Sequence, residues 1–108
     1  MYLKKFKDNL VYDGNVVRLN LLKYMEPKNN ALTMELLDGD PYATCSINID
    51  DKLSGNDLIC IKDYSENQGM LNFLLKNNVL TEVVGVIRSE YVEIPVCRLN
   101  LSNFIDVE

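Results

Sequence analysis

Hydrophobic and polar residues alternate along much of this chain. Between residues 16 and 25, Val17, Leu19 and Leu21 fall on one side of an extended backbone, and polar residues fall on the other. A period of two is typical of a β-strand that has one buried face and one solvated face. Related patterns predict further strands at residues 2–12, 31–37, 42–49, 83–88 and 91–99.

Short polar segments separate these strands. Asp13-Gly14-Asn15 predicts a tight hairpin turn, because Gly and Asn tolerate positive φ. Asp8-Asn9 is expected to break the first strand. Residues 38–41, Asp-Gly-Asp-Pro, predict the loop of a second hairpin. With that loop, the pattern favours a register that places Leu36 opposite Ala43, Met34 opposite Cys45 and Leu32 opposite Ile47.

The stretch from residue 58 to residue 80 predicts the centre of the fold. Four consecutive apolar residues, 58–61, suit a short strand that is buried on both faces. Ser65 and Gln68 have the spacing of a capping box, which predicts a helix at about residues 66–76. Asn77-Asn78 can adopt the left-handed conformation that ends it. The apolar face of this helix consists of Met70, Leu71, Phe73, Leu74 and Leu75.

The last part of the chain contains two residues with positional meaning. Pro95 cannot donate to a β-ladder, so its strand is expected at a sheet edge or with a bulge. Gly85 predicts a bulge or a close approach of the helix, and the tail from Asn100 is expected to pack loosely. These elements predict an α+β fold: a mainly antiparallel sheet of five or six strands with one helix packed on one face.

The composition fits a single domain that spans residues 1–108, with 47% apolar residues to form one core. The net charge of −5 is unevenly divided, since residues 1–28 hold six basic and three acidic side chains and residues 29–108 hold five and thirteen. Direct nucleic-acid binding is disfavoured, because only Lys4, Lys5 and Lys7 resemble a basic patch. The acidic surface either serves solubility or meets a basic protein partner.

The expected location is the cytoplasm, without membrane contact. No run of about eighteen apolar residues occurs, and no long apolar segment follows the basic residues near the N-terminus. Cys45, Cys60 and Cys97 are odd in number and far apart, which favours a reducing compartment. Each lies in an apolar pattern and is expected in the core, with a reactive or metal-binding thiol as the alternative.

The residues give little sign of catalysis. The chain contains no histidine, which removes the commonest general base and metal ligand. No nucleotide-binding, hydrolase or zinc-protease motif occurs, and Asp50, Asp51 and Asp57 lack EF-hand spacing. We therefore expect no enzyme, no catalytic residue, no metal and no cofactor. The alternative is a small enzyme that uses Cys97 or a pair of carboxylates.

The segment 62–67, Lys-Asp-Tyr-Ser-Glu-Asn, has the highest density of informative side chains. It lies between a strand and a helix, and it serves either as a structural connection or as a contact surface anchored by Tyr64. With the acidic loops, it supplies the residues that we expect to bind a partner: Glu35, Asp38, Asp40, Asp50, Asp51, Asp57, Asp63, Tyr64 and Glu66.

Two segments, IKDYSENQGMLNFLLKNN at 61–78 and VEIPVCRL at 92–99, resemble a family of small uncharacterised proteins from plasmids, conjugative elements and phages of gut-type bacteria. In that family an "IKDYSEN-G" segment precedes the helix and a "PVC-L" segment closes the domain. This chain has Asn77-Asn78 where the family pattern has Gly after the helix. The resemblance covers the C-terminal half best and implies a mobile-element protein, a class that includes anti-CRISPR and antirestriction inhibitors.

The leading hypothesis is a non-enzymatic acidic binding protein of a mobile element that inhibits a host defence nuclease. Acidic side chains would face the basic nucleic-acid channel of the partner protein. The second hypothesis is a structural or regulatory protein that self-associates through an edge strand, either the strand of Pro95 or the N-terminal one.

Overall fold

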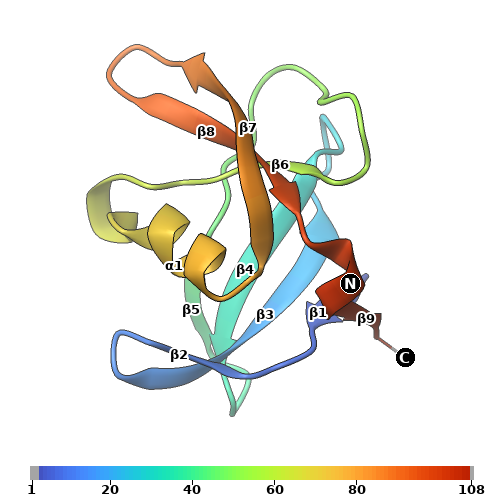
Figure 1. Ribbon diagram of the computed structural model, residues 1–108, viewed down its shortest axis with the longest axis vertical. Helices are drawn as coiled ribbons and strands as arrows, with labels where there is room; N and C mark the ends of the chain where they lie inside the picture. Colours follow the sequence, from blue (N-terminus) through green and yellow to red (C-terminus); the bar gives the residue numbers. More distant parts are fainter. Residues whose placement is uncertain (1–2, 108) are drawn as a thin grey trace.

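The computed structural model describes residues 3–107. These residues form one α-helix and nine β-strands in two antiparallel sheets (Figure 1), which confirms the expected α+β class. The helix is α1 (Met70–Lys76), and η1 (Ser65–Asn67) and η2 (Leu101–Asn103) are short 3₁₀ turns. The strands are β1 (Lys4–Phe6), β2 (Leu10–Tyr12), β3 (Asn15–Lys23), β4 (Asn30–Leu36), β5 (Pro41–Thr44), β6 (Leu58–Cys60), β7 (Leu80–Arg88), β8 (Glu93–Leu99) and β9 (Phe104–Asp106).

The larger sheet has six strands, in the order β5-β4-β3-β1-β9 with β2 also paired to β3. The strand expected at 2–12 is split at Asp8-Asn9 into β1 and β2, which pair with different parts of β3; residue 2 lies outside the described residues. The β2–β3 turn has φ of 53° at Asp13 and 80° at Gly14, as a tight two-residue hairpin requires.

The smaller sheet has three strands, in the order β6-β8-β7. An isolated bridge between Ser46 and Ile61 connects the two sheets. On one side, the N–H of Cys45 donates to the carbonyl of Leu32 at 2.8 Å, and on the other the N–H of Lys62 donates to the carbonyl of Cys45 at 2.9 Å. Residues 45–47 therefore pass from one sheet to the other.

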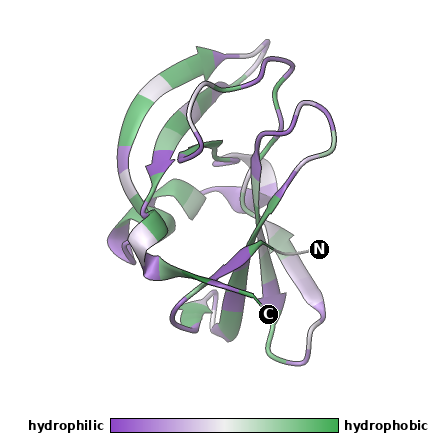
Figure 2. Cartoon of the chain, turned by 90° about the vertical axis from the view of Figure 1, so that its right-hand side faces the viewer, coloured by the Kyte–Doolittle hydropathy of each residue, from purple (hydrophilic) through white to green (hydrophobic). Residues whose placement is uncertain are grey.

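The main core lies between the two sheets and α1. Val17, Leu19 and Leu21 point into it from β3, as their alternation predicts, and Met70 and Leu74 enter it from α1. A smaller cluster of Cys60, Ile94 and Val96 lies at the other end of β6 and β8. Figure 2 shows that hydrophobic and hydrophilic stretches alternate along the chain. No helix in the described part of the chain is long and apolar enough to cross a membrane.

The helix begins later than expected, and the predicted Ser65–Gln68 capping box is wrong. Ser65 has a φ of 57° within η1, and Gly69 with a φ of 94° is the N-cap of α1. The carboxylate of Asp63 accepts a 2.8 Å hydrogen bond from the N–H of Leu71 instead. A carboxylate in this position satisfies one of the free N–H groups of the first turn.

The register of the β4–β5 hairpin also differs from the prediction, by two residues. Met34 pairs with Ala43 and Thr33 with Thr44, and a bulge lies between Met34 and Glu35. The turn is also shorter than the predicted four-residue loop. The N–H of Leu36 donates to the carbonyl of Asp40, and the N–H of Gly39 donates to the carbonyl of Leu36, each at 2.9 Å. A shift of two residues keeps each side chain on its predicted face.

The positions expected for sheet edges are correct only in part. Strand β8, which carries Pro95, is the centre of its sheet, and β1 lies between β3 and β9. The other half of the predicted N-terminal strand, β2, has β3 as its one partner among the described strands and lies at an edge. The carbonyl of Pro95 accepts from the N–H of Ile61 at 3.1 Å, beyond the end of β6, so the missing N–H of proline costs no ladder bond within β6. The bulge predicted at Gly85 is present, because the β7 register shifts between Val83 and Gly85.

The C-terminal tail packs more tightly than expected. Its strand β9 pairs with β1 over Lys4, Lys5 and Phe6. Phe104 is 5% exposed and meets Phe6 edge-to-face, with ring centroids 5.4 Å apart. Two aromatic rings buried in this geometry attach the tail to the main core.

Candidate functional site

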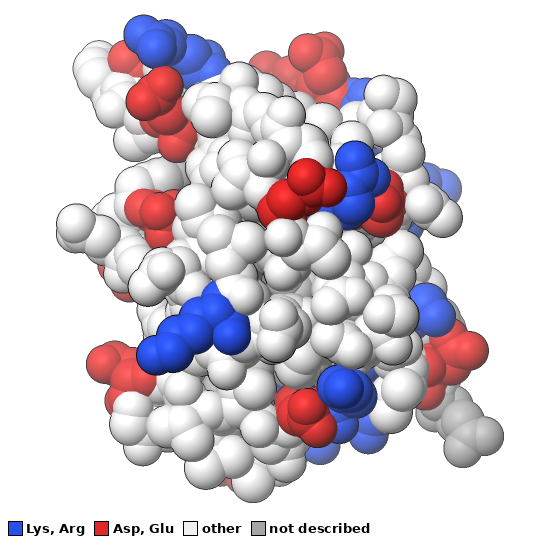
Figure 3. All heavy atoms as spheres, viewed as in Figure 1, with Lys and Arg blue, Asp and Glu red and all other residues white. Residues whose placement is uncertain are grey.

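The structure separates the candidate contact residues into groups. Glu35, Asp38 and Asp40 lie on the β4–β5 hairpin, Asp50, Asp51 and Asp57 on the loop before β6, and the other three between β6 and α1. In Figure 1 these segments lie at different ends of the molecule. Figure 3 shows acidic and basic side chains interspersed on the visible face. The fold therefore does not form a single continuous acidic surface on this face.

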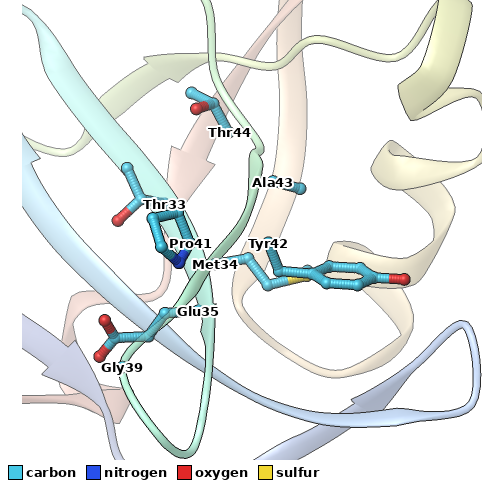
Figure 4. Close-up of a pocket in the computed structure, with 8 residues that line it drawn as sticks. All are labelled: Thr33, Met34, Glu35, Gly39, Pro41, Tyr42, Ala43 and Thr44. Carbon is cyan, nitrogen blue, oxygen red and sulfur yellow. The ribbon is translucent and has the colours of Figure 1, made fainter.

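The hairpin group borders a shallow hollow on the outer side of β4 and β5 (Figure 4). The carboxylate of Glu35 forms an ion pair with Arg18 at 3.1 Å, and Arg18 also donates to the carbonyl of Leu37 at 3.0 Å. Asp38 accepts from the N–H of Asp40 at 3.0 Å, which shapes the turn. The hollow therefore contains one acid whose charge is compensated within the chain.

The group between β6 and α1 is also occupied by internal contacts. Asp63 caps α1, while Lys62 contacts Glu66 at 2.6 Å and lies 5.6 Å from the centre of the Tyr64 ring. The hydrogen bond from Lys62 lowers the pKa of Glu66 to about 2, and the same bond raises the pKa of Lys62. These contacts favour the structural reading of this segment over a partner-binding one.

Asp57 belongs to an ion network at the edge of the smaller sheet. The guanidinium of Arg98 contacts the Asp57 carboxylate at 2.7 Å and that of Glu82 at 3.1 Å. The hydrogen bond from Arg98 lowers the pKa of Asp57. This network connects the loop before β6 to β7 and β8, and sequence alone gave no sign that Arg98 was the partner.

Asp50 and Asp51 have a different setting. Both side chains are exposed, and both line a shallow groove between their loop and the β7–β8 hairpin. Its floor is formed by Ile47, Ile49, Ile87 and Ile94, of which Ile94 is buried and the other three are half-buried. We call this feature, the four isoleucines with Asp50 and Asp51, the isoleucine groove. It combines an apolar floor with a rim that carries Asp50, Asp51 and Arg88, and the guanidinium of Arg88 is paired with Glu93 at 3.2 Å.

Two buried asparagines hold the loop that carries this rim, and sequence reasoning missed both. The side-chain amide of Asn29 donates to Asp51 O at 2.9 Å, and its oxygen accepts from the N–H of Leu53 at 2.8 Å. The amide of Asn30 donates to the carbonyls of Asn56 and Leu58 at 2.9 and 2.8 Å. In the sequence, both lie in the polar run Glu26-Pro27-Lys28-Asn29-Asn30, which is typical of a hairpin loop. The main-chain carbonyls that the two asparagines bind are more than twenty residues away in the sequence, so no pattern near Asn29 and Asn30 indicated these contacts.

The cysteines are packed within the protein. Cys45, Cys60 and Cys97 are all free thiols and are at most 2% exposed. Burial raises the pKa of Cys45 and Cys97 to about 12 and that of Cys60 to about 11. A thiol with a raised pKa forms little thiolate near neutral pH, so this environment favours a core role over a nucleophilic one.

No group of three or more His, Cys, Asp or Glu side chains within residues 3–107 is placed to hold a metal ion. The chain was also compared with models of protein families, with curated proteins and with solved structures, and none of the three comparisons gave a match.

Proposed function

We propose that this protein is a non-catalytic binding protein whose isoleucine groove receives a basic, partly apolar segment of a partner protein. The observation that carries the proposal is the position of Asp50 and Asp51 beside a floor of four isoleucines. Burial of the apolar floor would supply affinity, while the carboxylates would select and orient a positively charged partner.

The rigidity of the loop supports this choice among the acidic groups. Asn29 and Asn30 connect the loop to the start of β4 through side-chain hydrogen bonds of 2.8 to 2.9 Å. A surface that is already ordered loses less conformational entropy when it binds. Glu35, Asp57 and Glu66 are each paired to a cation of the same chain, so they have less charge to offer.

Asp50 and Asp51 favour a basic protein over a nucleic acid, whose phosphates the carboxylates would repel, and the charge of Arg88 on the same rim is compensated by Glu93. Nucleic-acid-binding proteins present such basic surfaces, and inhibition of a host nuclease in the cytoplasm is the narrowest form of this proposal. Steric and electrostatic occlusion of the nucleic-acid channel would be the mechanism. A catalytic role has less support, because the thiols are buried and their pKa values are raised.

The groove can be located with a defined probe, a short synthetic peptide of alternating leucine and lysine. In a ¹⁵N-HSQC titration, we expect the amide shifts of residues 47–51 and 87–94 to change most. A peptide of alternating leucine and glutamate controls for charge and should not bind. Shift changes confined to the β4–β5 hairpin, or spread evenly over the acidic surface, would contradict the proposal.

A further inference from the structure

Strand β7 is an edge strand with unusual exposure of apolar side chains. It is nine residues long, and its place at the end of the order β6-β8-β7 leaves its outer side without a neighbouring strand in the described chain. Val83 and Val84 are each 42% exposed, and Val86 is 56% exposed. Long apolar edges are templates for pairing with another chain, and proteins usually shorten or charge them.

The sequence of this edge is symmetric about Gly85. Going outward from Gly85, Val84 mirrors Val86, Val83 mirrors Ile87, and the acid Glu82 mirrors the base Arg88. Residues 82–88 therefore have apolar side chains on both sides of Gly85 and a charged side chain at each end. A strand with this pattern is complementary to a second copy of itself that runs in the opposite direction.

At Val86 the backbone of β7 is open to pairing with another strand. Val86 pairs with Pro95, whose carbonyl accepts from Ile61 on the β6 side. Because the backbone groups of Pro95 face β6, Val86 and Pro95 are a non-hydrogen-bonded pair. The N–H and C=O of Val86 therefore point away from β8, toward the open edge. The bulge makes the register skip Val84, so this residue has no partner in β8. Val84 and Val86 are the residues that a pairing centred on Gly85 would bring together.

We propose that two copies of this chain associate through β7, antiparallel about a two-fold axis at Gly85, to form a continuous six-stranded sheet. An added Cβ at Gly85 would meet nothing within 4 Å in the single chain, so the two glycines can approach closely across the axis. Val84 faces Val86 of the second copy, and Glu82 faces Arg88 of the second copy. This dimer does not require the function proposed above, but its surface adjoins the isoleucine groove, because Ile87 and Arg88 line that groove as well.

The charges at the ends of β7 select this register. Glu82 already contacts Arg98 at 3.1 Å, and Arg88 contacts Glu93 at 3.2 Å. All four groups are substantially exposed, with side-chain exposures of 42% to 81%. Pairing about Gly85 adds an opposite charge to each of these contacts. A two-residue slip, with Val86 on the axis, places Arg88 opposite Val84 and loses the ion pairs.

Sedimentation equilibrium from about 1 μM to about 1 mM tests the dimer, because a self-association must depend on protein concentration. We expect the wild type to shift from monomer to dimer within this range. Val86→Lys should remain a monomer. Val11→Lys replaces another exposed valine, 66% exposed on β2, and should still dimerise. A wild type that is monomeric throughout, or a Val86→Lys variant that dimerises normally, overturns the proposal.

Exchanging the charges of Glu82 and Arg88 tests the pairing register of the two β7 strands. Glu82→Arg alone and Arg88→Glu alone each place like charges opposite each other, and each should weaken dimerisation about tenfold. The double variant restores opposite charges across the axis and should recover most of the affinity. Far-ultraviolet circular dichroism and urea midpoints check that each variant folds. Single effects that the double variant fails to relieve would overturn the pairing about Gly85.

Discussion

Asn29 and Asp51 are joined by a hydrogen bond of 2.9 Å from the side-chain amide of Asn29 to the main-chain carbonyl of Asp51. Asn29 is only 3% exposed, and its oxygen accepts a second bond, from Leu53. A buried asparagine thus fixes the loop that carries the acidic rim of the isoleucine groove. Asn29 lies 22 residues from Asp51 and 24 residues from Leu53 in the sequence, so these contacts form only when the chain has folded.

Replacement of Asn29 should loosen this loop. We expect Asn29→Ala to lower the free energy of unfolding by about 1–3 kcal/mol, because the Asp51 carbonyl and the Leu53 N–H lose a buried partner. Urea unfolding measures the change, and hydrogen exchange should show faster exchange at Leu53. Asn9→Ala, at an exposed position between β1 and β2, is the control. Equal stability of the two variants would contradict the structural role of Asn29.

The N-terminus of α1 should depend on Asp63 and not on the predicted capping box. Asp63→Ala removes the acceptor for the Leu71 N–H and should cost about 1 kcal/mol in urea unfolding. Gln68→Ala removes the other half of the predicted box, an exposed side chain, and should have little effect. The reverse order of the two effects would restore the capping-box interpretation.

The Lys62–Glu66 contact should make stability depend on acid pH. The hydrogen bond from Lys62, with smaller contributions from a backbone hydrogen bond and from Ser65, lowers the pKa of Glu66 in the folded protein from 4.5 to about 2, so the unfolded chain binds more protons between these values. The stabilisation is present above about pH 4.5 and is lost as the pH falls toward about 2. The effect is small, because Glu66 is exposed.

Urea midpoints of the wild type and Glu66→Gln at several pH values between 2 and 5 measure this contribution. The difference between the two proteins should shrink as the pH falls. Glu90→Gln, at the exposed tip between β7 and β8, is the control. A constant difference over this range would show that the ion pair is not formed in solution.

The cysteines should be protected from reagents in the folded protein. Cys45 and Cys97 are fully buried and their thiol pKa values are raised to about 12, so both access and thiolate are limited. Reaction with an aromatic disulfide at pH 8 should follow the rate of unfolding and accelerate in urea. Fast labelling of Cys97 in the native state would instead support a reactive thiol.

The sequence predicted what depends on local pattern. Alternation identified the buried face of β3 at Val17, Leu19 and Leu21, and the Asp13-Gly14 turn has the expected positive φ values. A register shift of two residues leaves each side chain on the same face of the sheet. For this reason the prediction for the β4–β5 hairpin gave the correct buried face and the wrong pairing register. The start of α1 was missed because Asp63 reaches it across η1 and Gly69.

Long-range pairing could not be read from one sequence. Nothing near Phe104 indicates that β9 pairs with β1, and nothing near Pro95 indicates that β8 lies between two strands. The candidate site shows the same limit. Composition identified the acids, but only the fold shows that Asp57 is paired with Arg98 while Asp50 and Asp51 border an apolar groove.

The affinity of the alternating leucine–lysine peptide for two matched double variants shows whether the isoleucine groove is the binding site. Asp50→Asn with Asp51→Asn removes the rim charge, and Asp38→Asn with Asp40→Asn removes the same charge from the β4–β5 hairpin. We expect the first pair to weaken binding about tenfold and the second to have an effect of about twofold or less at moderate salt. Equal losses would show that the peptide responds to net charge alone, and no loss from the first pair would remove the isoleucine groove as the binding site.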